Sequence, residues 1–482
     1  MDRSIEETST LPRRRPEKAG ILHLGLGNFH RAHQAVFTAR ALEAEPGPWG
    51  IVGVANRARR VVDAMGEQAN RYSVLTLDPD GPRCDVLDLH LETLVMCEEP
   101  ERVVDLVARH DIRVVTLTVT EKAYQRPREP DRPAGTVDDA AARRKPWVID
   151  LLAQGLRARF RAGGAPLSLV SCDNVSANGR TLRDAVTGVL EEEGDSAEVL
   201  SWLSGSVGFP CTMVDRIVPA TEARHVDMVR ALTGVEDRAP VPAEPFSTWV
   251  MEDDFPGGRP AWDRAGVVFV DDVAPYELLK LRVVNTTNSL LAYLGLLLEE
   301  ELIADTLNRH ADVAAVADRM IRHEMLPTVT PPPLEVDSYV EQLFARFGNA
   351  AVGHRTAQVA SDGSVKLPIR IVDPVLHHHA RGTVPWGIAL LAASYVRVFT
   401  RPASGVPGRS PGPEDPWSEH LRRLGDTHRD SHDLVRAVLT GGPFRASLEP
   451  AGPWLAAVGD LHSRLVDGGV EEAVRHVARH RP

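Results

Sequence analysis

The sequence predicts an α/β domain followed by a mainly α-helical domain. Short β-branched runs, each followed by a glycine or Asx turn and a helical pattern, recur from Ile21 to about residue 275. From about residue 276 onward the pattern changes to long amphipathic helices, as in LLAYLGLLLEEELIADTL and DVAAVADRMIRHEML. We therefore expect a disordered tail at 1–18, an α/β domain at 19–275 and a helical domain at 276–482.

Composition narrows the class of protein. A chain of 482 residues with 43% apolar content can build two or more cores. A formal charge of −12 argues against a nucleic-acid or anionic-membrane surface, and the N-terminus has no signal-peptide core. No window reaches the roughly 18 apolar residues of a membrane helix. We expect a cytoplasmic protein whose partner is a small molecule; its oligomeric state is left open.

Neither a disulfide framework nor a metal site is expected. The four cysteines form no CxxC pair: Cys84, Cys97, Cys172 and Cys211. His377, His378 and His379 are consecutive, so their side chains do not converge on one ion.

The first expected strand begins at Ile21 and leads into a glycine turn and a helix, ILHLGLGNFHRAHQAVFTARALEAE. This is the layout of a dinucleotide-binding βα unit, in which Gly25 and Gly27 allow the turn and a close backbone approach to a pyrophosphate. The third glycine position of G-x-G-x-x-G is His30.

A second strand, WGIVGVA, starts at Trp49 and is followed by a basic run with Asn56, Arg57, Arg59 and Arg60. An acid at this place holds the ribose 2′-hydroxyl of NAD, whereas an arginine accommodates the 2′-phosphate of NADP. The run is also typical of a solvated helix start, so it does not decide between NAD and NADP as the cofactor.

Two later strands end in polar side chains. The run VVTLTVTEKAYQ from Val114 ends with Thr120, Glu121 and Lys122, where open α/β sheets place ligands. The run APLSLVSCDNVSANG ends in an Asx-rich loop with Asn174 and Asn178, which could simply make turns.

The stretch from Tyr276 to Gly295 predicts a buried helix that carries one lysine and two amides, Lys280, Asn285 and Asn288. At 100° per residue, Lys280, Asn288 and Asn285 fall at about 0°, 80° and 140° on one broad face. A desolvated lysine loses proton affinity and can act as a base, while amides can hold a developing oxyanion. The alternative is a snorkelling lysine with two amides bonded to a loop.

This helix resembles the signature helix of the mannitol dehydrogenase family, K-L-R-x-x-N-x-x-H-S. The resemblance implies that Lys280 is the general acid/base and that Asn285 polarises the reacting oxygen. The substrate-positioning histidine of the family is replaced by Asn288. The opening GxGNFHRAHQA is also similar to the family, which implies a cofactor site at these residues: Gly25, Gly27, Asn28, Phe29, His30 and Arg31.

Other motifs follow in the family's order. TVTEKAY resembles TVTEKGY and implies Glu121 as a proton-path residue. SCDNVSANG resembles SCDN-x-x-x-NG and implies that Asn178, with Asn174 in reserve, helps to hold the substrate oxygen. FPCTMVDRIVPAT resembles FPxTMVDRITP and implies that Asp215 lines the active site.

The helical domain contains HRTAQVASDGSVKLPIR, which resembles the sugar-acid branch of the family, the fructuronate reductases. Its basic residues suit an anionic substrate, with exposed surface charge as the alternative: His354, Arg355, Lys366 and Arg370. Where the family has NPAxR or NPALK, this chain has NAAVG at residues 349–353. The sequence therefore leaves open which substrate branch of the family it resembles.

The resemblance implies a Rossmann-like domain followed by a mostly α-helical domain. It implies NAD-dependent, metal-independent hydride transfer on a linear polyol or sugar acid, with Lys280 as acid/base. The alternative, raised by Asn288, is a catalytically weakened protein that binds a dinucleotide or sugar acid.

Overall fold

The computed structural model describes residues 15–125, 147–329, 335–400, 412–444 and 447–480, and the chain divides into two compact units, 1–274 and 275–482. Residues 1–14 of the expected tail lie outside the described residues. At the end of that tail, Arg15 pairs with Asp88 at 3.0 Å.

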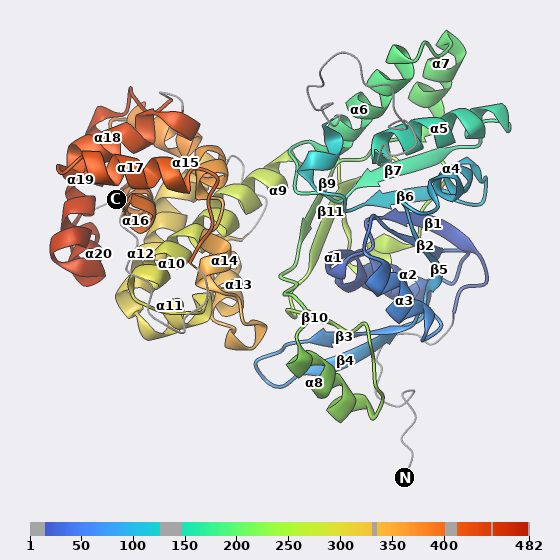
Figure 1. The fold of residues 1–482 in the computed structure, drawn as a ribbon, viewed down its shortest axis with the longest axis horizontal. Coiled ribbons are helices and arrows are strands. Elements are labelled where there is room, and N and C mark those ends of the chain that lie inside the picture. The colour runs from blue at the N-terminus through green and yellow to red at the C-terminus, as the bar shows by residue number, and fades with distance from the viewer. Residues whose placement is uncertain (1–14, 126–146, 330–334, 401–411, 445–446, 481–482) are drawn as a thin grey trace, which may run out of the picture. The chain divides into compact units, whose positions relative to one another are not determined.

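Six parallel strands form the central sheet of the first unit (Figure 1). The strands are β1 (Ala19–Leu24), β2 (Gly50–Ala55), β5 (His90–Val95), β6 (Val114–Leu117), β7 (Leu167–Ser171) and β8 (Val207–Gly208). Their order is β5-β2-β1-β6-β7-β8, so the winding direction reverses between β1 and β6. Doubly wound sheets bind ligands at such a switch point, beyond the carboxyl ends of the strands.

The strands are apolar on both faces because helices or smaller sheets cover both. Successive residues alternate between two cores: Ile21, Ile51 and Val114 join one cluster, and Leu22, Val52 and Val115 join the other. The first cluster packs on the helices after β1, and the second packs on α4, α5 and α6.

The helices of this unit are α1 (Asn28–Ala32), α2 (Gln34–Ala44), α3 (Arg59–Gly66), α4 (Pro100–Ala108), α5 (Val148–Arg161), α6 (Asn178–Glu192), α7 (Ala197–Ser206) and α8 (Ala223–Thr233), with 3₁₀ turns η2 (Glu121–Tyr124) and η3 (Trp262–Ala265). Two smaller sheets accompany the central one. The first has the order β10-β3-β4, from Val241–Ala243, Tyr72–Thr76 and Arg83–Leu87, and it lies beside α8 in Figure 1. The second has the order β12-β11-β9, from Val268–Val270, Thr248–Glu252 and Thr212–Asp215.

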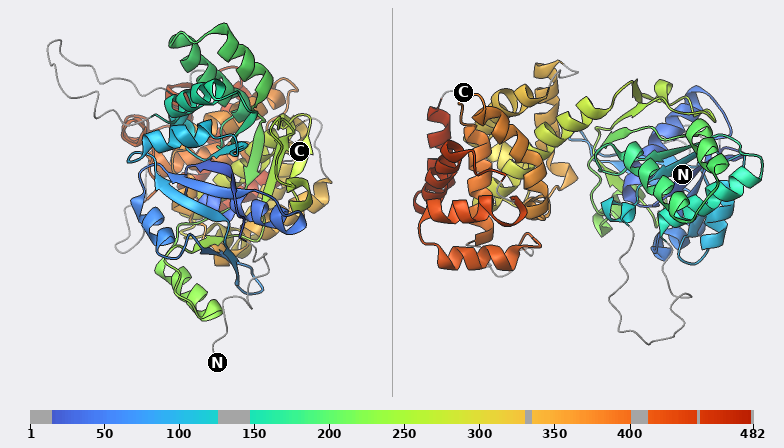
Figure 2. Two further views of the ribbon diagram at one scale, coloured as in Figure 1. Left: turned by 90° about the vertical axis from the view of Figure 1, so that its right-hand side faces the viewer. Right: turned by 90° about the horizontal axis from the view of Figure 1, so that it is seen from above.

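The second unit is built from helices, with no named strand among its described residues, as the right-hand view of Figure 2 shows. Its α-helices are α9 (Ala274–Leu279), α10 (Thr286–Leu297), α11 (Ile303–Arg309), α12 (Ala311–Arg319), α13 (Val336–Phe347), α14 (Thr356–Ala360), α15 (Gly363–His379), α16 (Trp386–Thr400), α17 (Ser418–Thr427), α18 (Ser431–Thr440), α19 (Gly452–Asp467) and α20 (Gly469–Arg479). Two π turns, η4 (Lys280–Asn285) and η5 (Met320–Met325), interrupt the α-helical stretches, and the 3₁₀ turns are η6 (Leu326–Thr328), η7 (Ala350–Val352) and η8 (Gly442–Phe444).

The centre of this unit is the pair α10 and α16, which is apolar around most of its circumference. Gly295 allows close packing, since a Cβ there would lie 2.2 Å from Thr306 Oγ1. The expected fold class, a Rossmann-like parallel sheet followed by a mostly helical part, is confirmed.

Candidate active site

The glycine turn after β1 meets the end of β6 at the switch point of the sheet. Gly25 has φ +108°, and a Cβ there would lie 2.1 Å from the carbonyl oxygen of Thr118. Its backbone N–H donates to Val54 O at 2.8 Å. Position 25 therefore requires glycine for the fold itself.

Gly27 differs from Gly25, because the described residues leave the space next to it open. Among them, only Gly25 O, at 3.6 Å, would lie within 4 Å of a Cβ at Gly27. Asn28 and Phe29, which follow at the start of α1, are half-buried. An open cradle beside a tight turn fits the close approach of a dinucleotide pyrophosphate.

His30 and Arg31 were expected to bind the cofactor, but the structure places both side chains in the interior. The His30 ring is fully buried, stacks on His23 with centroids 3.3 Å apart, and has its Nε2 3.1 Å from His90 Nε2. Burial lowers the pKa of His30 well below its usual value. His30 therefore fills the core where a third glycine commonly stands.

Arg31 is 4% exposed, and its guanidinium makes hydrogen bonds to other residues of the chain. It donates to Ala239 O at 2.6 Å and to Asn28 Oδ1 at 2.7 Å. Arg31 thus holds α1 to the segment before β10 and gives Asn28 a fixed orientation.

The carboxyl end of β2 carries the basic run expected near the ribose. Asn56 directly follows the strand and is exposed. Arg59 donates to Glu98 Oε1 at 2.9 Å and lies 3.4 Å from Asp63. In the described part of the chain, the side chains of Arg57 and Arg60 have neither a hydrogen bond nor an ion pair.

A network that the sequence motifs did not reveal lies beyond β6 and β7. Thr120 has φ +76°, and its N–H donates to Asp173 Oδ1 at 2.7 Å. Tyr124 donates to Asp173 Oδ2 at 2.7 Å, and burial raises the pKa of Asp173. Thr120 and Tyr124 belong to the TEKAY motif and Asp173 belongs to the SCDN motif, so the motifs were the available signal. The adjacent Glu121 is exposed.

The side chain of Asn178 makes hydrogen bonds to two other segments of the chain. Its Nδ2 donates to Asp173 O at 3.1 Å and Thr212 O at 2.9 Å, while its Oδ1 accepts from Thr212 N at 2.9 Å. The side chain is 1% exposed, so it is not placed to hold a substrate oxygen. Asn174 is exposed, and Asp215 is half-buried at the end of β9.

In the second unit, Lys280 and Asn285 are the first and last residues of the π turn η4. A π turn uses i→i+5 hydrogen bonds, so residues five apart come closer to one face than the 140° expected for an unbroken α-helix. Asn288 follows three residues later on α10. All three side chains are half-buried.

Polar groups stabilise the wider π turn. Thr286 Oγ1 donates to Leu281 O, five residues earlier, at 3.2 Å. Arg370, on α15, donates through one terminal nitrogen to Asn285 O at 3.0 Å and to Ser289 Oγ at 2.6 Å. These bonds satisfy carbonyls in and beside the π turn.

Asn288, at the position of the family histidine, has an unused acceptor. Its Oδ1 is buried and has no hydrogen-bond partner in the described ranges. A buried polar atom without a partner is costly, and a ligand hydroxyl or N–H can satisfy it.

The other basic candidates have different environments. Arg355 is exposed and pairs with Glu301 at 2.8 Å, which matches the surface-charge alternative. Lys366 Nζ donates to Ser361 O at 2.7 Å and lies 3.9 Å from Asp362. Burial, followed by the charge of Arg370, lowers the pKa of Lys366. Burial lowers the pKa of His354 to about 4.

No group of His, Cys, Asp and Glu side chains within the described ranges is arranged to hold a metal ion. His378 bonds Thr383 Oγ1 at 3.0 Å and Glu324 O at 2.9 Å. None of the described helices is both long and apolar enough to cross a membrane.

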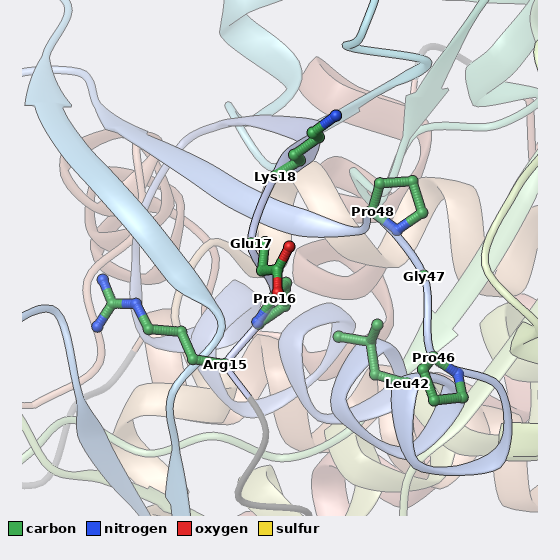
Figure 3. A pocket seen from close by; sticks show the side chains of 8 residues that line it. All are labelled: Arg15, Pro16, Glu17, Lys18, Leu42, Pro46, Gly47 and Pro48. Carbon is green, nitrogen blue, oxygen red and sulfur yellow. The ribbon is translucent and has the colours of Figure 1, made fainter.

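A hollow of about 290 Å³ lies at the opposite edge of the central sheet (Figure 3). It is lined by Lys18, just before β1, and by Gly47 and Pro48, just before β2. Because open α/β sheets bind at the carboxyl ends of their strands, this hollow is not the cofactor site.

Comparisons with known proteins cover nearly the whole chain. Residues 19–264 match the mannitol dehydrogenase Rossmann domain, and residues 272–446 match the mannitol dehydrogenase C-terminal domain. D-mannonate oxidoreductase of Escherichia coli (strain K12) is 34% identical, over 97% of this chain and 98% of the relative. Mannitol 2-dehydrogenase of Cereibacter sphaeroides is 34% identical, over 89% of this chain and 93% of the relative.

Among solved structures, mannitol 2-dehydrogenase of Pseudomonas fluorescens, in a ternary complex with NAD and D-mannitol, superposes with a TM-score of 0.81. It is 29% identical and covers 100% of both chains.

Proposed function

The chain belongs to the mannitol dehydrogenase family, and on this premise we propose that it interconverts a secondary alcohol and a ketone of a linear polyol or sugar acid. NAD is its cofactor, as the family and the glycine cradle indicate. When bound, the nicotinamide accepts or donates the hydride.

Lys280 is the proposed general acid/base. In the oxidative direction neutral Lys280 takes the hydroxyl proton of the alcohol, and in reduction protonated Lys280 returns it. This proton transfer needs no metal ion. The Asn285 amide donates to the oxygen on which charge develops. Asn288 Oδ1 accepts a hydrogen bond from a second substrate hydroxyl.

We assign a positioning role to Asn178. It ties the loop after β7 to β9 through three bonds. It thereby shapes the loop without contacting the reacting oxygen.

The π turn is the observation that supports the catalytic assignment most strongly. π turns inside α-helices occur frequently at functional sites, because they cost backbone hydrogen bonds that selection otherwise removes. Here the turn starts at Lys280 and ends at Asn285. Arg370 and Thr286 stabilise it with side-chain bonds.

Absorbance at 340 nm tests the proposal. Purified protein with NADH or NADPH is offered D-fructuronate, D-tagaturonate, D-fructose and ribulose. We expect loss of absorbance with at least one of them. No turnover on any of the four, with NADH binding intact by fluorescence, would support the catalytically weakened alternative instead.

Lys280→Ala separates chemistry from binding. We expect turnover to fall by roughly 10²–10⁴-fold, the usual contribution of a general acid/base, with little change in NADH affinity. Lys18→Ala is the matched control, because Lys18 is exposed and lies just before β1, at the opposite edge of the sheet. Preserved turnover in Lys280→Ala would refute the assignment.

A further inference from the structure

Arg370 is a half-buried arginine with an incomplete set of partners. One terminal nitrogen of its guanidinium bonds Asn285 O and Ser289 Oγ. Within the described ranges, its other two nitrogens have no hydrogen-bond partner. The guanidinium therefore keeps unused N–H donors. A guanidinium with such donors can bind both oxygens of a carboxylate at once.

No carboxylate compensates the charge of Arg370 in the part of the chain that the structure describes. Other arginines of the same unit differ: Arg282 lies 3.3 Å from Asp373, and Arg309 lies 3.1 Å from Glu300. A desolvated cation without a counter-ion is expensive, and burial lowers the pKa of Arg370 to about 10. An arrangement of this kind is stabilised by an anionic ligand.

A second cation adds to the positive potential. Lys366 lies one helical turn before Arg370 on α15, so both side chains share a face. The charge of Arg370 is one of the causes that lower the pKa of Lys366, which places the two cations near each other. Asp362, at 3.9 Å, offsets Lys366 only in part.

We propose that Arg370, assisted by Lys366, binds the carboxylate of the substrate, so that this enzyme prefers a sugar acid over a neutral polyol. Arg370 bonds the main chain of Asn285, which carries the amide proposed to hold the reacting oxygen. A linear substrate can thus place its carboxylate on Arg370 and its carbinol carbon on the face of Lys280 and Asn285. The inference rests on the proposed function, because it uses the same active-site face.

D-fructuronate and D-fructose test this directly, because they share the ketone and differ only at the far terminal carbon, a carboxylate against a hydroxymethyl group. We expect the wild-type enzyme to have a KM for D-fructuronate at least tenfold below that for D-fructose. In Arg370→Gln the KM for D-fructuronate should rise about 10- to 100-fold, the effect of losing a charge-assisted bond. The KM for D-fructose should rise less than threefold.

The kcat is expected to fall for both ketoses in Arg370→Gln, because Asn285 O loses its donor. Arg370→Lys keeps the charge without the fork and should recover part of the KM for D-fructuronate. Arg309→Gln, which removes an exposed and paired arginine of the same unit, is the matched control. Equal changes of KM for the two ketoses in Arg370→Gln would overturn the carboxylate assignment.

Thermal unfolding keeps the inference testable if no ketose is turned over. With NAD present, D-gluconate should raise the unfolding midpoint of the wild type more than D-sorbitol does, and Arg370→Gln should lose that difference. No turnover with this difference present contradicts the proposed chemistry but supports the carboxylate subsite. A difference that persists in Arg370→Gln would overturn the subsite whatever the turnover.

Discussion

Asn288 stands where the family has a histidine, and its buried Oδ1 has no donor among the described residues. An unsatisfied buried acceptor destabilises the free protein and favours a ligand that supplies a hydrogen-bond donor. Asparagine keeps one hydrogen-bonding function of the histidine, although it loses the charge and the ring geometry. We therefore interpret Asn288 as a change in substrate contact within a working site.

Replacing Asn288 by Ala tests this interpretation. We expect kcat/KM to fall by about 10- to 100-fold, the usual cost of one lost substrate hydrogen bond. The free energy of unfolding should change by less than about 1 kcal/mol, since the removed acceptor had no partner. Steady-state kinetics and urea unfolding measure the two quantities.

Thr287→Val is the control, because Thr287 Oγ1 is also buried without a partner in the described ranges and stands next to Asn288. Valine has nearly the same shape, so this change should leave kcat/KM as it was. If Asn288→Ala behaved like Thr287→Val, a substrate contact at position 288 would be ruled out.

Individual side chains were the hardest feature to predict from the sequence. The glycine turn was predictable, because Gly25 needs a positive φ that few other residues adopt. The inward position of His30 was not, since its packing depends on His23 and His90, which are distant in sequence. Asn178, at the start of α6, shows the same limit, because its partner Thr212 lies on β9, 34 residues along the chain.

At the scale of elements, the strands and the helix with Lys280 were predictable from apolar runs and turn residues. The π turn was not, because a shift from i→i+4 to i→i+5 bonding has no signature in residue types. Arg370, which donates a hydrogen bond to the last residue of the turn, comes from α15, 85 residues along the chain. The expected angle of 140° between Lys280 and Asn285 was therefore wrong for a physical reason.

The end of β2 makes a prediction about the cofactor. Where an acid would hold a ribose hydroxyl, the chain has Asn56, followed by two arginines without partners in the described residues, Arg57 and Arg60. A double change of Arg57 and Arg60 to Ala should weaken NADP binding about 10- to 100-fold and NAD binding less than threefold. Isothermal titration calorimetry measures both affinities.

Arg59→Ala is the matched control, because Arg59 is already paired with Glu98. It should change the ratio of NADP to NAD affinity by less than threefold. Equal weakening of both cofactors by the double change would contradict a 2′-phosphate contact.

At the scale of the whole molecule, each unit buries its own set of titratable groups. In the first unit, burial lowers the pKa of both His23 and His90 to about 3 and lowers that of His30 well below 6.5. In the second unit, burial raises the pKa of Glu324 from 4.5 to about 7, although its oxygens accept from Gly387 N and Ile388 N at 2.8 and 2.9 Å. In the same unit burial lowers the pKa of His354 to about 4, so two shifts of opposite sign meet there, whereas the three histidines of the first unit act together.

The three histidines stay neutral in the folded first unit, while the unfolded chain takes up protons below pH 6.5. Stability is thus present above pH 6.5 and is lost as the pH falls toward 3. Between pH 7 and 5.5 we expect a loss of about 1 kcal/mol per histidine. Glu324 keeps its proton in the folded state, so its contribution is present below pH 4.5 and is lost as the pH rises through 7. Between pH 5.5 and 7 that loss is about 1.5 kcal/mol, and the gain of about 1 kcal/mol from His354, which stays neutral in the folded second unit, offsets most of it.

Pulse proteolysis in urea, read by mass spectrometry of peptides from each unit, follows both cores in one experiment. Lowering the pH from 7 to 5.5 should lower the unfolding midpoint of the first unit and change that of the second little. Glu324→Gln should make the midpoint of the second unit fall as well and leave the first unit's fall in place, because the substitution takes away only the titrating carboxyl. Two units whose midpoints fell together with Glu324 in place would show that other groups control the response to pH.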